Sequence, residues 1–461
     1  MSDVRIETDA LGDYEVPAEA YYGIGTARAR DNFTISGQGL PRSFIQALGV
    51  IKASAARANM DLELLDPEVA KAIAAAAMEV AAGRWDSEFV VDVFQTGSGT
   101  STNMNANEVI ANRANEILGG SKGAYSPVHP NDQVNRSQSS NDVIPTAIHL
   151  SALLEYRTGL LPALYRLETA LKAKSVEFHG VIKTGRTHLM DATPIRLGQE
   201  FEGYAGQIEQ ARRGVSFAAE SLREVALGGT AVGTGVNAPR EFARRTLGYV
   251  NQAEKVQLRE TPNHFRAQSS IDASVAMSGA LRATAVAMIK IANDIRLMGS
   301  GPRAGLYELA LPALQPGSSI MPGKVNPVIP EAVVQVGAQV IGNDAAIAAA
   351  GQWGFFELNT MLPVAARNLL ESIRLLSNVA TAFSERCIVG LETTGEGPRL
   401  LEQGLAIVTP LANVIGYDRA SMIAKEAFAT RRTVREVAGE MTDLGPEELD
   451  RLLDPAGMVD P

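Results

Sequence analysis

One segment of the chain, residues 317–327, combines groups suited to acid–base chemistry with residues that interrupt regular structure. Ser318 and Ser319 are followed by Lys324 and Asn326, and two glycines and two prolines lie among them. This composition predicts a loop, which either connects two helices or presents a hydroxyl, an ammonium and an amide to a substrate. A phosphate-binding loop is excluded, because it needs four residues between its glycines and a serine or threonine after the lysine. Here five residues separate the glycines and a valine follows the lysine.

Three further segments concentrate polar side chains, and each has two interpretations. Residues 95–108 either cap a following helix or form a nest of N–H and hydroxyl groups for an anion. Residues 129–142 form either a solvated turn or a binding site. Residues 185–194 contain His188. Histidine is a residue type suited to proton transfer, although most single histidines in such segments are structural.

Long helices are expected to position these segments. Apolar spacing predicts helices over 43–60 and 68–82, and a shorter one over 107–118 that ends at two glycines. A proline-free stretch between Pro262 and Pro302 predicts a helix of about 30 residues, roughly 45 Å long. Its apolar residues surround most of the cylinder, so it must be buried on most sides. A bundle shared among several copies of the chain would bury it.

Composition restricts the function. The 461 residues are 46% hydrophobic and 20% charged, as in ordinary soluble proteins. The net charge of −10 argues against a nucleic-acid partner, and an anionic substrate would need local counter-charges. The single cysteine, Cys387, excludes an intrachain disulfide and favours a reducing compartment. We find no signal peptide and no run of roughly 18 apolar residues, so we expect a cytoplasmic protein without a membrane partner.

The segment Gly-Ser-Ser-Ile-Met-Pro-Gly-Lys-Val-Asn-Pro at 317–327 closely resembles the signature of the fumarase/aspartase superfamily. The resemblance continues through Thr-Gly-Ser-Gly-Thr at 96–100 and Ser-Gln-Ser-Ser-Asn-Asp at 137–142, covers nearly the whole chain, and is greatest to class II fumarases. It implies an all-α, three-domain fold with a central bundle of long helices shared in a homotetramer. We expect a mostly helical N-terminal domain over 1–140, the long-helix domain over 141–394 and a small helical C-terminal domain over 395–461.

The resemblance also implies roles for individual residues. Ser318 is the expected base, and Glu331 is the expected carboxylate partner of His188. The other implied catalytic residue is Lys324. The residues implied in substrate binding are Ser98, Thr100, Asn103, Ser139, Ser140, Asn141, Thr187, Ser319 and Asn326. A peripheral anion site is implied at His129, Asn131 and Asp132. Each active site would combine residues of three subunits.

The implied activity is the reversible hydration of fumarate to L-malate through an aci-carboxylate. Such chemistry needs fixed cations and dipoles around one carboxylate, with a base and an acid on opposite faces of the substrate. A small dicarboxylate is therefore the expected partner. We expect no cofactor, and the five histidines show no convincing metal-ligand pattern.

Two alternatives stay open. Aspartate ammonia-lyase is the first, although several aspartases have glutamine in place of His188. The second is a helical scaffold without activity, which retention of the complete acid–base set argues against. The chain also departs from the fumarase pattern: His264 and Arg266 stand where lysine and glutamate are usual, and Gln352-Trp353-Gly354-Phe355 is bulkier than usual. Either departure could change packing or substrate preference.

Overall fold

The computed structural model describes residues 3–460, and most of them are helical. Seventeen α-helices are joined by short 3₁₀ and π turns, and the ten strands form five two-stranded sheets. The prediction of an all-α fold is confirmed. Two compact units divide the chain. The first unit contains residues up to 162, 213–285 and 338–377, and the second contains 163–212, 286–337 and 378 onward. The three-domain division stays a prediction.

Four of the five boundaries between the two units fall within long helices: α7 (Leu197–Ser221), α10 (Asp272–Met298), α11 (Val328–Gly351) and α12 (Leu362–Phe383). The helix predicted between the prolines at 262 and 302 is therefore confirmed as α10. Thr284 interrupts the apolar pattern of α10, but its hydroxyl is not left unpaired, because it donates to the Ala280 carbonyl at 2.9 Å. Helices α10 and α11 are long and apolar enough to cross a membrane, a test that core helices of soluble proteins also pass.

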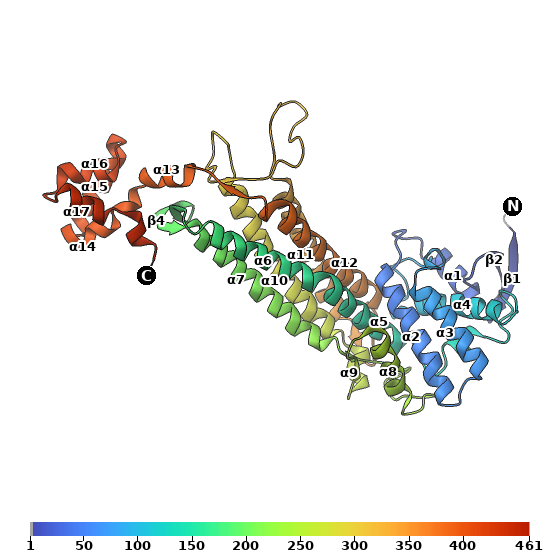
Figure 1. Cartoon of the computed structure of the whole chain (residues 1–461). Helices are drawn as coiled ribbons and strands as arrows, with labels where there is room; N and C mark the ends of the chain where they lie inside the picture. The colour runs from blue at the N-terminus through green and yellow to red at the C-terminus, as the bar shows by residue number, and fades with distance from the viewer. Residues whose placement is uncertain (1–2, 461) are drawn as a thin grey trace. The chain divides into compact units, whose positions relative to one another are not determined.

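The first unit contains the N-terminal hairpin and most of the shorter helices. Its remaining elements are β1 (Val4–Asp9), β2 (Gly12–Pro17), α1 (Ile24–Asn32), α2 (Arg42–Asp61), α3 (Pro67–Ala81), η1 (Asp86–Glu88), α4 (Thr100–Ile117), η2 (Pro130–Val134), α5 (Ser140–Glu155), η3 (Tyr156–Leu160), β5 (Glu224–Val225), α8 (Phe242–Glu254), β6 (Arg259–Glu260), α9 (His264–Ser269), β8 (Gly354–Phe355) and β9 (Leu358–Asn359). Helices α2 and α3 lie side by side (Figure 1) and confirm the two predicted helices. The Asp66 side chain caps α3 by accepting from the Glu68 N–H at 2.9 Å.

Helix α4 begins at Thr100, seven residues earlier than predicted. The sequence prediction was wrong here because hydroxyl and amide side chains disfavour helix when they are solvated, whereas these are buried: Asn103, Asn105 and Asn107 are each at most 3% exposed. Gly99 turns the chain into the helix with a positive φ of 73°. The polar segment is thus the first two turns of a helix rather than a loop before it.

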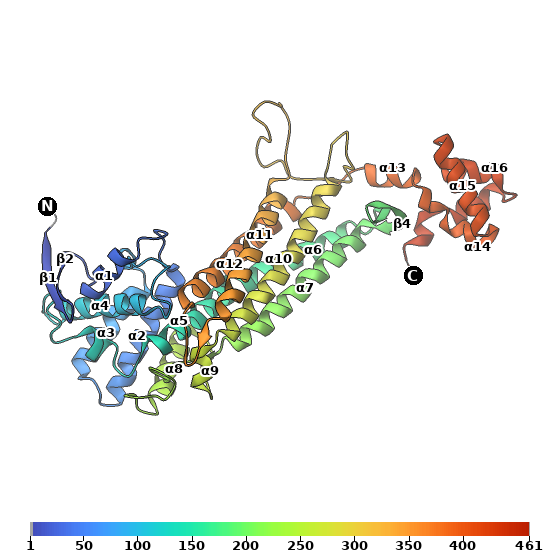
Figure 2. The same cartoon turned by 180° about the vertical axis from the view of Figure 1, so that it is seen from behind.

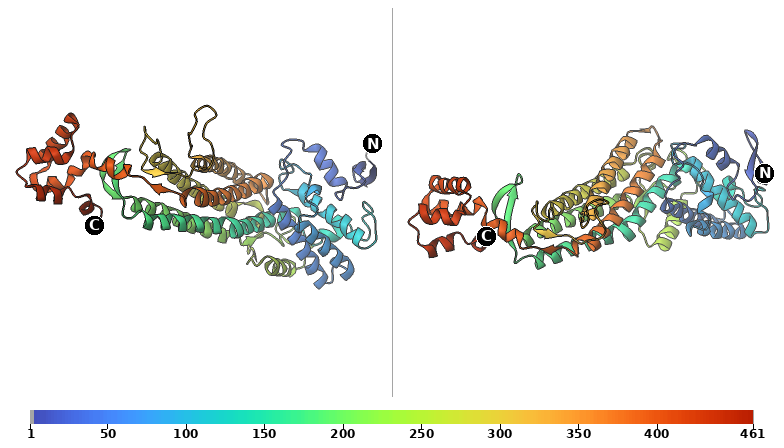
Figure 3. Two further views of the ribbon diagram at one scale, coloured as in Figure 1. Left: turned by 45° about the horizontal axis from the view of Figure 1, so that its top comes forward. Right: turned by 90° about the horizontal axis from the view of Figure 1, so that it is seen from above.

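The second unit contains two features of functional interest, a β-hairpin and a long irregular segment. Its other elements are α6 (Leu161–Glu177, whose first two residues precede the unit), β3 (Ile182–Thr187), β4 (Met190–Arg196), β7 (Leu309–Ala310), η4 (Ser384–Ile388), β10 (Glu392–Thr393), α13 (Glu396–Glu402), η5 (Leu405–Leu411), α14 (Ala412–Ile415), α15 (Tyr417–Thr430), α16 (Val434–Met441), α17 (Pro446–Leu452) and η6 (Pro455–Met458). Helices α14 to α17 cluster near the C-terminus (Figure 2) around a small aliphatic core that includes Leu411, Ile423 and Val437. Strands β3 and β4 pair as an antiparallel hairpin beside α13 (Figure 3).

Candidate active site

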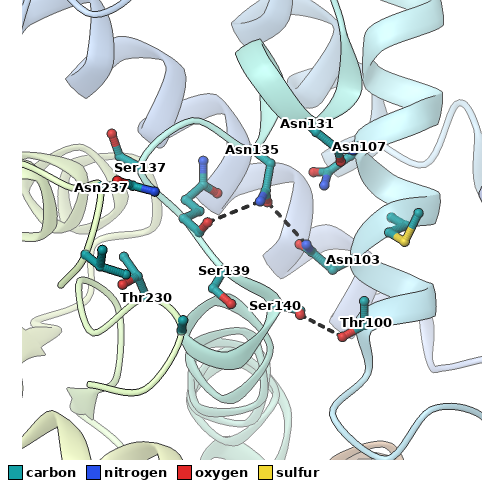
Figure 4. Close-up of a pocket in the computed structure, with 14 residues that line it drawn as sticks. Thr100, Asn103, Asn107, Asn131, Asn135, Ser137, Ser139, Ser140, Thr230 and Asn237 are labelled. Carbon is teal, nitrogen blue, oxygen red and sulfur yellow. Dashed lines mark hydrogen bonds between the residues drawn. The ribbon is translucent and has the colours of Figure 1, made fainter. Parts of the chain in front are cut away.

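A polar cavity of ≈ 370 Å³ lies in the first unit where helices α4 and α5 begin (Figure 4). Thr100 opens α4, and Ser139 caps α5. The Ser139 hydroxyl accepts from the backbone of α5, while the Asp142 carboxylate accepts from the Ser139 N–H at 3.0 Å. Both helices thus direct the positive ends of their dipoles toward the same region, which suits an anion.

The predicted site residues divide between lining and supporting positions. Those that line the cavity are Thr100, Asn103, Asn131, Ser139 and Ser140. Ser98 lies behind them, buried, with its hydroxyl 2.8 Å from that of Thr100. The Thr100 hydroxyl is in turn 2.7 Å from that of Ser140, so hydroxyls from α4 and α5 form one hydrogen-bonded chain. Asn141 supports the wall, because its side-chain amide donates to the Ala231 carbonyl at 2.8 Å.

Sequence reasoning missed several lining residues: Asn107, Asn135, Ser137, Thr230 and Asn237. Three of them lie in polar segments that the sequence singled out, Asn107 in 95–108 and Asn135 and Ser137 in 129–142, although the family resemblance pointed to other positions there. Thr230 and Asn237 lie in or just after a glycine-rich segment, which was a separate signal. Residues 228–235 contain four glycines, three of which adopt positive φ, at Gly228, Gly233 and Gly235. Such a glycine-rich turn brings backbone close to a ligand or to another chain segment.

Asp142 joins the glycine-rich turn to the start of α5. Its carboxylate accepts from the N–H groups of Gly228 at 3.0 Å and Thr230 at 2.9 Å, in addition to Ser139. Burial raises the pKa of Asp142, and these N–H groups act against that rise by stabilising the carboxylate. A single buried side chain therefore positions two walls of the cavity.

The cavity lining carries no formal charge among the residues that the structure describes: it consists of hydroxyls, amides and a few apolar side chains. A carboxylate bound there would be held by N–H and O–H dipoles and by the two helix N-termini. The local counter-charges expected for a dicarboxylate must therefore come from outside this lining.

The residues implied in a peripheral anion site, His129, Asn131 and Asp132, lie at the π-helical turn η2. The His129 Nδ1 atom accepts from the N–H groups of Asn131 at 3.2 Å and Asp132 at 3.3 Å, so the imidazole caps the π-helical turn η2. With Nδ1 accepting, any proton on a neutral ring is on Nε2. The Asp132 carboxylate lies 3.6 Å from the ring nitrogen. Asn131, the third residue of the set, lines the cavity.

His188 occupies the tip of the β3–β4 hairpin in the second unit. His188 and Leu189 both adopt left-handed conformations, with φ of 57° and 61°, and both are exposed. A two-residue turn of this type is normally built from asparagine and glycine. Each non-glycine residue held in that region costs about 1 kcal/mol or more. Retained strain of this kind is frequent at functional positions, where it fixes the direction of a side chain.

The signature segment forms an exposed loop in the second unit. Gly317 and Lys324 close it with a backbone hydrogen bond of 2.7 Å, and the Asn326 amide donates to the Gly317 carbonyl at 2.7 Å. The Ser318 hydroxyl accepts from the N–H groups of Ile320 at 3.2 Å and Met321 at 2.9 Å. Two N–H donors directed at this oxygen would stabilise it as an alkoxide, which is what a serine needs to act as a base.

The remaining predicted residues also belong to the second unit. Lys324 and Ser319 are exposed on the loop, and Thr187 is exposed at the end of β3. Glu331 lies in the first turn of α11. Among residues 3–460, no hydrogen bond or ion pair joins Glu331 to His188. Their pairing stays a prediction.

The departures from the family pattern have partners in the first unit. His264 lies 3.0 Å from Glu260, and Arg266 forms an ion pair with Glu224. The exchanged charges are thus matched by glutamates of the same chain. Trp353 packs edge-on against Phe355, with ring centroids 5.7 Å apart. No group of three or more metal-ligating side chains occurs in the described part of the chain.

Comparisons with known proteins agree with the fold and the motifs. Residues 12–342 match a lyase family, and residues 407–460 match the family described as the fumarase C C-terminus. The chain is 53% identical to a class II fumarate hydratase of Mycobacterium tuberculosis over 99% of its own length and 96% of that protein. It is 51% identical to one from Thermosynechococcus vestitus, covering 98% and 97%.

A solved class II fumarase from Schistosoma mansoni superimposes with a TM-score of 0.96 at 38% identity, covering 99% of both chains. These relatives are named as fumarate hydratases or fumarases and not as aspartate lyases. Because the likeness extends over nearly the whole of each protein, the chain belongs to the class II fumarate hydratase family of lyases.

Proposed function

We propose that the protein is a fumarate hydratase, a hydro-lyase that interconverts fumarate and L-malate. The observation that carries the proposal is the cavity at the start of α4 and α5, whose hydroxyl and amide dipoles suit a carboxylate. The chain that forms this cavity is about half identical to fumarate hydratases throughout its length. The substrate class is a small dicarboxylate. A four-carbon dicarboxylate needs little volume, so the ≈ 370 Å³ cavity accommodates it.

Dehydration of malate begins at the carbon next to one carboxylate. Ser318, as an alkoxide, takes a proton from that carbon, and the electron pair moves into the carboxylate to give a doubly charged aci-carboxylate. The electron pair then returns from the aci-carboxylate to form the carbon–carbon double bond while the carbon–oxygen bond on the neighbouring carbon breaks. The departing hydroxide takes a proton from an acid on the opposite face of the substrate to become water. Hydration of fumarate is the reverse. The two N–H groups that contact Ser318 Oγ support this role, because they stabilise the alkoxide before the reaction.

The other residues act on charge and orientation. Lys324 and Asn326 would face the aci-carboxylate, where an ammonium and an amide stabilise the added charge. His188 would bind the second carboxylate or activate the water, with Glu331 orienting its ring. Thr100, Ser140 and Asn103 would hold a carboxylate at the helix N-termini, where Thr100 and Ser140 already share a hydrogen bond of 2.7 Å.

The cavity residues belong to the first unit, whereas His188 and Ser318 belong to the second. We therefore propose that the working enzyme is a homotetramer whose sites combine residues of three subunits. Less than half of the most apolar window of α10 and of α11 is buried within one chain, so these helices have apolar surface for such contacts. The proposed location is the cytoplasm, where the reaction would serve the tricarboxylic acid cycle.

The test follows fumarate by its ultraviolet absorbance. Purified protein is offered L-malate and, in parallel, L-aspartate, and Ser318→Ala is compared with Ser319→Ala as the matched control. We expect malate turnover that falls about 10³-fold in Ser318→Ala, in the range typical for loss of a general base, and much less in Ser319→Ala. Turnover of aspartate alone would replace the proposal with an ammonia-lyase. Absence of turnover with both substrates would refute it.

A further inference from the structure

Lys52, on α2 in the first unit, is a lysine buried behind the cavity. Its relative exposure is 0%, and its ammonium donates to the Asn135 Oδ1 atom at 2.9 Å. An ammonium has three N–H groups and is seldom buried unless it is paired with a charge. Burial lowers the pKa of Lys52 to about 7, and the charge of Asp142 opposes that decrease. Among residues 3–460, no carboxylate forms an ion pair with Lys52. The free-energy cost of burying this ammonium therefore calls for an explanation.

The position of Lys52 determines which way two amides of the cavity face. Because an ammonium can only donate, the Asn135 side chain must turn its oxygen toward Lys52. The same oxygen accepts from the Asn103 Nδ2 atom at 3.2 Å, and the Asn135 Nδ2 atom donates to the Gln138 carbonyl at 3.2 Å. Asn135 and Asn103 both line the cavity, and Figure 4 shows their hydrogen bond. Lys52 therefore controls the amide orientation on one wall.

Lys52 is a cation that donates a hydrogen bond to a residue of this cavity wall. Helices α3, α4, α5 and α8 and the turn η2 pack against α2. Asp142 of α5 is the group whose charge acts on Lys52, and its carboxylate already accepts from three backbone N–H groups. Charged groups on the other elements interact with partners of their own. Glu79 of α3 forms an ion pair with Arg113 of α4, and Glu108 of α4 accepts from the Gly23 N–H. Arg245 of α8 forms an ion pair with Glu241, and Asp132 of η2 lies beside His129.

We propose that Lys52 is a positioning residue for the substrate carboxylate: its buried ammonium, acting through Asn135, supplies positive charge to an uncharged cavity and fixes the amides that contact the substrate. This inference rests on the proposed function, since it assigns the carboxylate of that substrate to the wall formed by Asn103 and Asn135. Lys52 does not line the cavity. A charge one hydrogen bond away in a poorly solvated region still stabilises an anion, because little water screens it.

The experiment compares Lys52→Met with the unchanged protein in steady-state assays with L-malate and with fumarate at pH 6, where Lys52 carries its proton. Methionine keeps most of the length of the side chain and removes the charge. We expect KM to rise about tenfold for both substrates with little change in kcat, because the carboxylate is held equally in the ground and transition states. The midpoint of thermal unfolding should stay the same or rise, since a buried charge has been removed. Lys122→Met, at a lysine that contacts Glu19 outside the cavity, is the matched control and should leave KM unchanged.

A second comparison tests whether Lys52 acts through Asn135. Asn135→Leu should raise KM to a similar extent, and the double variant should be no worse than either single variant, because both substitutions interrupt one interaction. Asn135→Leu also provides the test if Lys52→Met does not fold. A KM within twofold of the unchanged enzyme in both single variants would refute the inference, and so would additive effects in the double variant. Failure of the unchanged enzyme to convert malate would instead refute the proposed function.

Discussion

The cavity of the first unit and the hairpin and loop of the second unit differ in how firmly one chain holds them. The cavity wall is a continuous hydrogen-bonded structure: hydroxyls of Ser98, Thr100 and Ser140 form a chain, and Asp142 accepts from three N–H groups. In the second unit, Ile320 of the loop is 84% exposed. Within residues 3–460, the side chains of His188 and Lys324 have no hydrogen-bonding partner.

This difference separates binding from proton transfer. The groups proposed to hold a carboxylate are preorganised within a single chain, so they would need no rearrangement to bind. The groups proposed to move protons lie on a strained turn and an exposed loop, where they could meet another subunit of the proposed homotetramer. Four predictions examine the contrast, from the largest expected effect to the smallest.

Asp142→Ala should damage the preorganised region most. The N–H groups of Ser139, Gly228 and Thr230 would lose their acceptor in a buried or partly buried position, and we expect the free energy of unfolding to fall by about 4 kcal/mol. Denaturant unfolding of the variant and of the unchanged protein measures this difference in the free energy of unfolding. Asp132→Ala, at an exposed carboxylate of the same region, should change the value by less than about 0.5 kcal/mol. Equal effects of the two substitutions would show that the wall is not held by Asp142.

The stability contributed at Lys52 should depend on pH. Its pKa is about 7 in the folded protein and 10.5 in the reference state, so between these values the unfolded chain binds a proton that the folded chain does not. The free energy of unfolding should therefore rise with pH across this interval, by about 2 kcal/mol from pH 7 to 9. Denaturation of the unchanged protein and of Lys52→Met at each pH isolates the effect. A difference that is independent of pH would contradict it.

Gly317→Ala should impair the loop without unfolding the protein. A Cβ atom there would lie 2.6 Å from the Lys324 carbonyl oxygen and 2.9 Å from the Asn326 nitrogen, so the closing contact of the loop must shift. We expect kcat to fall at least tenfold, or about 1.4 kcal/mol, through displacement of Ser318. Gly180→Ala, where a Cβ meets nothing within 4 Å, is the control. Unchanged kcat in Gly317→Ala would show that loop closure is not needed.

Leu189→Gly should slightly stabilise the hairpin. Leu189 has a φ of 61°, a conformation that glycine adopts freely, and the entropy of glycine in the unfolded chain offsets part of the gain. The free energy of unfolding should rise by about 0.5 kcal/mol. Met190→Gly, in the adjoining strand, should lower it instead. Lower activity together with higher stability in Leu189→Gly would support the interpretation that the strain directs His188.

Much of the scaffold could be predicted because it depends on local signals. Helix α3 starts at a proline preceded by a capping aspartate, and α10 fills an interval free of proline. The start of α4 could not be predicted in this way. Its asparagines favour turns when solvated, and only their burial against other elements makes helix the better conformation.

The sequence by itself determined the helical architecture, the family and the chemical character of the candidate residues, because proline positions, apolar spacing and the signature segment are local properties of the chain. Tertiary structure alone decided which of these residues meet. It joined Asn135 and Thr230 in one cavity across about a hundred residues, turned the Asn135 oxygen toward Lys52, and placed His188 on a strained turn. The physical reason is that burial and amide orientation depend on neighbours distant in the chain, which no local pattern encodes.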